Sequence, residues 1–120
     1  MEPQVAALVR EYRGFLRDLK APEKRNIVAL TEIARDALQT APRAARGLSE
    51  AMLQRALEAP PAHKLAALYL MDSSCKLVGD PLKAHLVPLL PEAFAATWQA
   101  SGPDTWRALQ KLAGTWRGVV

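Results

Sequence analysis

The chain has 120 residues, of which 50% are hydrophobic and 23% charged, and its 16 Lys and Arg against 12 Asp and Glu give a net charge of +4. This length supports one hydrophobic core and is too short for two, so we expect residues 1–120 to form a single domain. The single cysteine excludes an internal disulfide scaffold, and the mild basic excess favours acidic partners without marking a nucleic-acid-binding protein.

The composition favours helix over sheet. Alanine occupies 22 positions, whereas Val, Ile and Thr together occupy 14, and we therefore expect an all-α fold. No apolar run approaches the ~20 residues of a membrane span, and the first residues lack the basic start and apolar stretch of a secretory signal. A soluble, intracellular protein is expected.

Nine prolines divide the chain into segments, most of them at points where a helix would begin or end. Apolar residues at three- and four-residue steps predict a first helix over about 3–19 and a second over about 22–39, with Phe15 and Ile33 among the residues expected to face inward. A third helical segment is expected to begin near Pro42. The alternative is a break at Gly47, in which a short turn precedes the main helix and Ser49 caps that helix.

The most apolar segment, 62–78, is hydrophobic around most of its circumference, which is typical of a central helix. Gly79 suits the position after its end, and Asp80-Pro81 predicts the start of a short helix that continues to about Leu90. Two further helices are expected from Pro91 and over 103–117. Successive antiparallel pairs of about seven helices favour a small right-handed stack over a symmetric four-helix bundle.

Polar residues interrupt the central helix on one side, because Tyr69, Asp72, Ser73 and Lys76 follow one another at helical spacing. Two interpretations stay open from the residues alone. In the first, Asp72 and Lys76 form an ordinary helix-surface ion pair and Tyr69 fills the core. In the second, the face is the floor of a groove, where Asp72 accepts a hydrogen bond, Tyr69 forms an aromatic wall and Lys76 supplies positive charge.

Two further pairs of cations are candidate phosphate contacts. Arg107 and Lys111 stand four residues apart on the last helix, and Lys24 and Arg25 lie in the first turn of the second helix, where the helix dipole favours anions. The alternative for both pairs is a solvated helix face.

Motifs for catalysis or metal binding are missing from the sequence. Two histidines and one cysteine are too few and too poorly spaced for a zinc site, and no phosphate loop or nucleophile elbow occurs. We therefore expect no enzyme, no metal and no cofactor. Trp98, Trp106 and Trp116 are expected to pack between helices, and Cys75 is expected to be a buried, unreactive thiol.

The central helix carries a recognisable string, made of Lys64-Leu65, Leu68-Tyr69-Leu70-Met71-Asp72-Ser73, Lys76, Val78 and Gly79. It closely resembles the signature helix of the domains that interact with the C-terminal repeat domain of RNA polymerase II, above all that of the pre-mRNA cleavage and polyadenylation factor Pcf-eleven. Two further segments match, Phe15-Leu16-x-Asp18-Leu19 and Thr105…Leu109…Leu112…Thr115-Trp116. The resemblance spans about residues 8–119.

The resemblance implies a right-handed superhelix of about seven to eight helices, similar to VHS and ENTH domains, without enzymatic activity. It implies a ligand of Tyr-Ser-Pro-Thr-Ser-Pro-Ser repeats, often phosphorylated, lying across a groove of the second, fourth and seventh helices. Asp72 would then accept the hydroxyl of the repeat's tyrosine, with Tyr69, Met71 and Ser73 lining the groove. Lys111 falls where relatives carry a basic residue near the phosphoserine.

The sequence departs from the family pattern at several positions. Leu77 stands at a peptide-contact position where many relatives have asparagine, so one peptide hydrogen bond is missing. The stretch 101–106 lacks the family's charges, which affects the surroundings of the phosphate. The family's final helix is expected to be absent or truncated.

The hypothesis from the sequence is a nuclear module that binds the polymerase repeats and couples transcription to mRNA 3′-end processing or termination, without contacting a membrane. Other cleavage-factor subunits would be reached through the rest of a longer parent protein, and RNA is a secondary candidate partner. Two alternatives stay open: a membrane-trafficking adaptor of the VHS or ENTH kind, and a scaffold that has lost its peptide ligand.

Overall fold

A computed structural model describes residues 2–117, and this part of the chain is helical, without strands. Its α-helices are α1 (Pro3–Leu16), α2 (Lys24–Thr40), α3 (Ala45–Glu58), α4 (Lys64–Leu77), α5 (Leu82–Leu86), α6 (Leu90–Gln99) and α7 (Pro103–Gly114). Three single-turn 3₁₀ segments, η1 (Pro42–Ala44), η2 (Pro61–His63) and η3 (Val87–Leu89), precede α3, α4 and α6. The all-α prediction is confirmed. The described residues form six longer α-helices, and seven only if the five-residue α5 is counted. The expected count of seven to eight helices and the likeness to VHS and ENTH domains therefore stay predictions.

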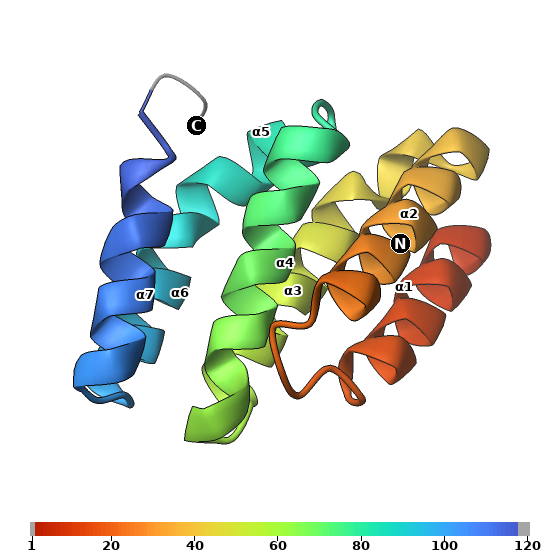
Figure 1. Cartoon of the computed structure of the whole chain (residues 1–120). Coiled ribbons are helices and arrows are strands. Elements are labelled where there is room, and N and C mark those ends of the chain that lie inside the picture. The colour runs from red at the N-terminus through yellow and green to blue at the C-terminus, as the bar shows by residue number, and fades with distance from the viewer. Residues whose placement is uncertain (1, 118–120) are drawn as a thin grey trace.

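Helix α4 lies in the middle of the fold, with α2 on one side and α7 on the other (Figure 1). It packs against α2 and α3, while α1 packs against α3 and α7 against α6. Nine of its fourteen residues are buried, as expected for a helix that is apolar around most of its circumference. The prediction of a central helix is confirmed.

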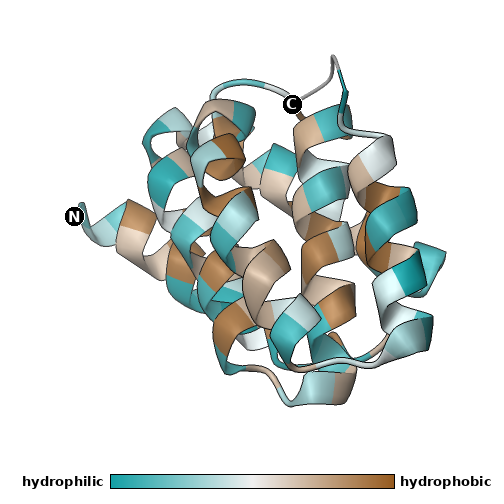
Figure 2. Ribbon diagram, turned by 90° about the vertical axis from the view of Figure 1, so that its left-hand side faces the viewer, coloured by the Kyte–Doolittle hydropathy of each residue, from teal (hydrophilic) through white to brown (hydrophobic). Residues whose placement is uncertain are grey.

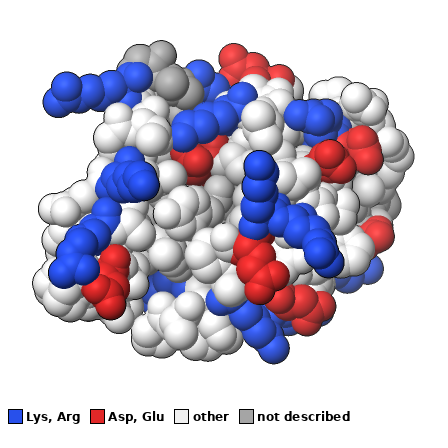
Figure 3. All heavy atoms as spheres, in the orientation of Figure 1, with Lys and Arg blue, Asp and Glu red and all other residues white. Residues whose placement is uncertain are grey.

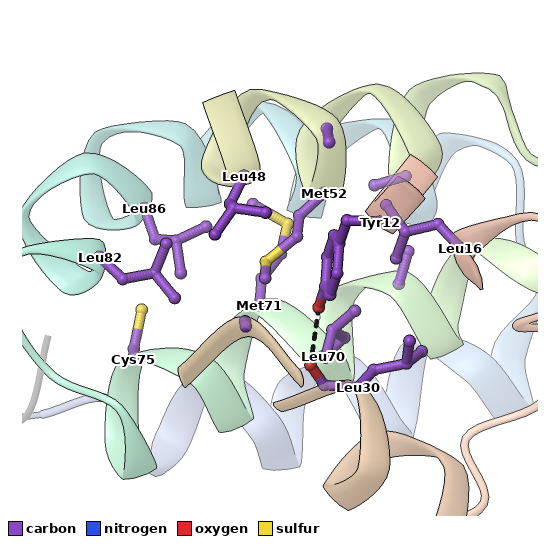
Figure 4. Close-up of a cluster of buried hydrophobic side chains, with 14 of the residues drawn as sticks. Tyr12, Leu16, Leu30, Leu48, Met52, Leu70, Met71, Cys75, Leu82 and Leu86 are labelled. Atoms are coloured by element: carbon purple, nitrogen blue, oxygen red, sulfur yellow. Dashed lines mark hydrogen bonds between the residues drawn. The ribbon is translucent and has the colours of Figure 1, made fainter. Parts of the chain in front are cut away.

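The core is continuous from α1 to α7. Leu68, Leu70 and Met71 of α4 have no exposed surface, and Met71 lies close to Leu48 and Met52 in Figure 4. Each helix combines hydrophobic with hydrophilic residues (Figure 2), which is the pattern of helices that bury one side and expose the other.

The third helix does not break at Gly47. The turn η1 runs directly into α3, Gly47 is buried in helical backbone, and the hydroxyl of Ser49 donates to the carbonyl oxygen of Ala45 at 2.6 Å. Ser49 therefore lies inside the helix and is not its cap. The cost of a helical glycine, about 1 kcal/mol, is offset here because α3 also buries Ala51, which lies on the same side one turn further on.

Two residues that were expected to face inward are partly exposed, Phe15 at 40% and Ile33 at 36%. Both line a hollow of about 240 Å³ between α1 and α2. Helical periodicity identifies the apolar side of each helix, but it does not tell how far the neighbouring helix covers that side. The prediction of inward positions was wrong for these two side chains.

Several helix ends differ from the predicted ones. Helix α1 ends three residues earlier than expected, α2 begins at Lys24 because Glu23 is extended with ψ 127°, and α7 ends at Gly114. Gly79 follows α4 with φ +74°, a conformation that glycine adopts without strain, and this position was predicted. In residues 2–117, no helix is both long enough and apolar enough to cross a membrane.

Candidate functional site

The polar face of α4 is organised around the carboxylate of Asp72, which is 9% exposed. Its Oδ1 atom accepts a hydrogen bond of 2.7 Å from the indole Nε1 of Trp116 and lies 2.7 Å from the ammonium group of Lys76. A carboxylate in such a partly buried place needs charged or polar partners, and these two supply them. Asp72 is thereby held in a fixed orientation.

Lys76 connects α4 to the turn after α7. Its Nζ atom donates to the hydroxyl of Thr115 at 2.7 Å as well as pairing with Asp72. The ion pair that the first interpretation expected is therefore present, but it is not an ordinary surface pair: the side chains of Asp72 and Lys76 are only 12% and 29% exposed. Together with Trp116, the pair fixes the end of α7 beside α4.

Helix α2 forms the other side of this face. The buried hydroxyl of Thr31 donates to the carbonyl oxygen of Ile27 at 2.7 Å and lies 2.8 Å from the hydroxyl of Ser73. A hydroxyl carries one proton, and Thr31 uses its proton in the bond to Ile27. Ser73 is therefore the donor in the contact with Thr31. Ser73 therefore faces α2, and its hydroxyl holds the two helices together.

At the end of α4, the guanidinium of Arg35 donates to the carbonyl oxygen of Leu77 at 2.6 Å. This satisfies one of the carbonyl groups that a helix leaves unpaired at its last turn. The side chain of Leu77 is 56% exposed, so the position where relatives carry asparagine lies on the surface beside a cation from α2.

Tyr69 and Met71 have different surroundings. Tyr69 is half-buried on the polar face, whereas Met71 is fully buried in the core. Residues two apart on a helix are separated by about 200° around its axis, so Met71 lies on nearly the opposite side from Tyr69. The prediction that Met71 lines the groove was wrong.

The candidate phosphate contacts lie on helices on the two sides of α4. Lys24 and Arg25 are exposed in the first turn of α2, and Lys111 is exposed on α7. Arg107 pairs with Asp104 at 2.8 Å, and both side chains are exposed. Figure 3 shows this face, with charged side chains on both sides and a mostly uncharged surface between them, interrupted near its upper edge by a red group beside blue atoms.

The tryptophans pack between α6 and α7. The rings of Trp98 and Trp106 stack with centroids 5.3 Å apart, and Phe94 meets Trp116 edge-on at 6.0 Å. The Nε1 atom of Trp106 donates to the carbonyl oxygen of Trp98 at 2.9 Å. The packing role predicted for the tryptophans is confirmed.

Cys75 is buried on the core side of α4. Burial, together with the nearby carboxylate of Asp72, raises the pKa of its thiol to about 11. The thiolate is the reactive form of cysteine, and such a pKa keeps it scarce at neutral pH. This agrees with the prediction of a buried hydrophobic residue.

Comparison with known proteins assigns the family. The model of the CID domain matches residues 13–118, which is most of the chain. The chain belongs to the CID domain family. CID domains are protein-interaction domains that bind C-terminal repeat peptides of RNA polymerase II, and they are not an enzyme family. The family resemblance seen in the sequence is confirmed.

A crystal structure of the RPR domain of Pcf11 is similar to this CID domain, with a TM-score of 0.79 and 25% sequence identity. The match covers 90% of this chain and 79% of the other. CID domains of the Pcf11 kind belong to the nuclear machinery of transcription and RNA processing.

Three side chains of the CID domain's polar face were not predicted for the roles they have. Thr31 and Arg35 stand four residues apart on α2 and so share the side that faces α4, a spacing visible in the sequence. The bond from Trp116 to Asp72 joins residues 44 positions apart, and no local pattern in the sequence indicates it.

Proposed function

We propose that this CID domain binds heptad-repeat peptides of the C-terminal domain of the largest RNA polymerase II subunit, in unmodified or phosphorylated form. The peptide would lie on the polar face of α4 between α2 and α7, against Tyr69, Asp72, Ser73, Lys76 and Leu77. The observation that carries the proposal is the state of Asp72: a carboxylate held in a fixed orientation, with its side chain still 12% exposed, in a domain of a peptide-binding family.

Asp72 has acceptor capacity left for a ligand. Both of its donors, from Trp116 and Lys76, bond to Oδ1, and among the described residues no donor bonds to Oδ2. An ionised carboxylate offers about four lone-pair sites. A tyrosine hydroxyl of the peptide can therefore donate to Oδ2 without displacing Trp116, and a hydrogen bond to a charged acceptor is stronger than a neutral one.

Phosphorylated serines of the peptide would meet cations on either side of this face. Lys111 and Arg107 on α7 are the candidates at one side, and Lys24 and Arg25 on α2 at the other. Arg107 is available despite its pair with Asp104, because exposed ion pairs of this kind contribute little and exchange partners readily. Lys76 adds positive charge in the middle.

In the cell, the domain would act in the nucleus and couple transcription to mRNA 3′-end processing or termination. The likeness to the RPR domain of Pcf11 supports this assignment. Other cleavage-factor subunits would be contacted by further parts of a longer protein, and residues 1–120 would contribute the single peptide-binding domain.

A titration with a fluorescent two-repeat peptide, unmodified and serine-phosphorylated, tests the proposal. Wild type should bind, and Asp72→Asn should bind about tenfold more weakly, because it removes the charge but keeps an oxygen for Trp116. Asp36→Asn is the matched control, since Asp36 is an exposed aspartate in the hollow between α1 and α2. Absence of wild-type binding, or equal loss in both variants, contradicts the proposal.

The titration, combined with sedimentation of the domain with acidic liposomes, separates the two alternatives. A domain that sediments with acidic liposomes and ignores the peptide would be a membrane adaptor of the VHS or ENTH kind. A folded domain that binds neither would be a scaffold without its ligand.

A further inference from the structure

A second charged hollow lies between α1 and α3, and none of its residues belongs to α2, α4 or α7. Its volume is about 230 Å³. Three arginines line it: Arg13 in α1, Arg17 directly after α1, and Arg55 in α3. The other lining residues are Leu16, Ala51, Gln54 and Glu58. Three cations around one hollow repel one another, and a counter-charge placed among them would relieve this repulsion.

The neighbouring protein groups do not supply that counter-charge. Glu58 is the single acid of the hollow, and its Oε1 atom accepts a hydrogen bond of 3.0 Å from Gln54. Among the described residues, no carboxylate lies within 4.0 Å of the guanidinium nitrogens of Arg13, Arg17 or Arg55. The hollow therefore keeps a formal charge of about +2, from three arginines and one glutamate.

Arg55 is held in place before any ligand arrives. Its Nη2 atom donates to the carbonyl oxygen of Leu19 at 3.0 Å, and its buried Nε atom has no hydrogen-bond partner among the described residues. Arg13 donates to the side-chain oxygen of Gln54. Two of the three guanidinium groups are thus oriented by contacts with the protein, which lowers the entropy lost when an anion binds.

We infer that this hollow is a binding site for a phosphate monoester group. Such a group carries a charge of about −1.5 to −2 at neutral pH, which matches the charge of the hollow. Its oxygens accept the forked hydrogen bonds that arginine donates. The hollow is several times larger than the ~30 Å³ share of a water molecule, so it also has room for the group that carries the phosphate.

The site is tested on the chain labelled with ¹⁵N at arginine, by following the Nε–Hε resonance of Arg55. Inorganic phosphate, a Gly-Gly-phosphoserine-Gly-Gly peptide and its unphosphorylated form are each added at constant ionic strength. We expect a saturable shift with both phosphates and none with the unphosphorylated peptide. Tighter binding of the phosphopeptide would identify a phosphoprotein as the source, and equal binding would identify the free anion.

Variants separate this site from general attraction of anions. Arg17→Gln should weaken phosphate binding about tenfold, and Glu58→Gln should strengthen it, because one negative charge leaves the wall. Arg10→Gln is the matched control, since Arg10 is exposed on α1 outside the hollow. A shift that does not saturate, or that is equally affected by Arg10→Gln and Arg17→Gln, overturns the inference.

Failure of this phosphate site can be told apart from failure of the proposed binding of repeat peptides. Arg17→Gln should leave the affinity for unmodified repeat peptide unchanged, and Asp72→Asn should leave the Arg55 shift unchanged. Loss of both kinds of binding in either variant would overturn the separation of the two sites.

Discussion

The indole of Trp116, in the turn after α7, donates a hydrogen bond of 2.7 Å to the carboxylate of Asp72 in α4. Trp116 also packs edge-on against Phe94 of α6, so it connects three helices. The same carboxylate is the group proposed to accept a hydrogen bond from the peptide. Asp72 therefore contributes one oxygen to the stability of the domain and offers the other to the ligand.

Trp116→Phe is expected to lower the free energy of unfolding by about 1–3 kcal/mol, because it removes a hydrogen bond to a charged acceptor and keeps an aromatic ring. Chemical denaturation followed by circular dichroism measures the change. Trp106→Phe is the control: it removes a bond to the neutral carbonyl of Trp98 and should cost less, about 1 kcal/mol. Equal stability of Trp116→Phe and wild type would show that the bond is absent in solution.

The contact between Thr31 and Ser73 should show energetic coupling. Thr31→Val removes the acceptor for Ser73 and should cost about 1–2 kcal/mol, whereas Ser73→Ala removes the donor. A double-mutant cycle of unfolding free energies should give a coupling of about 0.5–1.5 kcal/mol. Additive effects would contradict the hydrogen bond between α2 and α4.

The raised pKa of the Cys75 thiol is expected to make the domain less stable in mild alkali. Its folded pKa of about 11 lies above the ordinary value near 8.5, so the folded chain holds the thiol proton more tightly than the unfolded chain. The contribution is complete below pH 8 and falls as the pH rises through 9 toward 11, by about 1–2 kcal/mol between pH 8 and pH 10.

The measurement is the denaturation midpoint of wild type and Cys75→Ala at pH 8 and pH 10. The variant should lose less stability over this interval. Burial also raises the pKa of Tyr12, and its contribution begins to fall near its ordinary value of about 10. Tyr12 is present in both proteins, so the difference between their pH dependences isolates Cys75. The same pH dependence in both proteins would rule out the thiol as its cause.

Leu77→Asn should strengthen binding of the repeat peptide severalfold, because it restores the amide that many relatives carry at this position. The side chain is 56% exposed, so the change in stability should stay within about 0.5 kcal/mol. Ile33→Asn, also on the surface but between α1 and α2, is the control and should leave the affinity unchanged. Weaker binding by Leu77→Asn would mean that the peptide contacts the leucine itself.

Much of the fold could be predicted from the sequence, because helical periodicity and proline positions are local signals. The central place of α4 followed from apolar residues around most of its circumference, and the position of Gly79 followed from its conformational freedom. The errors came from packing between helices: Gly47 stays helical because α3 is buried, and Phe15 stays partly exposed because α2 does not cover it.

The candidate site was predictable in its centre and less so at its edges. The spacing of Asp72 and Lys76 predicted their ion pair, and the family string pointed to the same face. Met71 was misplaced because the string marks a helix and not one side of it. Trp116 contacts Asp72 from 44 positions away in the sequence, and Arg35 contacts Leu77 from 42 positions away. Such contacts follow only from the folded arrangement.

The most direct test of the account is a double-mutant cycle between Asp72 and the tyrosine of a two-repeat peptide. Dissociation constants are measured by fluorescence anisotropy for wild type and Asp72→Asn, each with the tyrosine peptide and with a peptide carrying phenylalanine in its place. The account predicts that each single change weakens binding, and that the double change weakens it little more than either alone, with a coupling of about 1–2 kcal/mol. Independent, additive losses, or no binding by wild type, would contradict the claim that Asp72 receives the tyrosine hydroxyl.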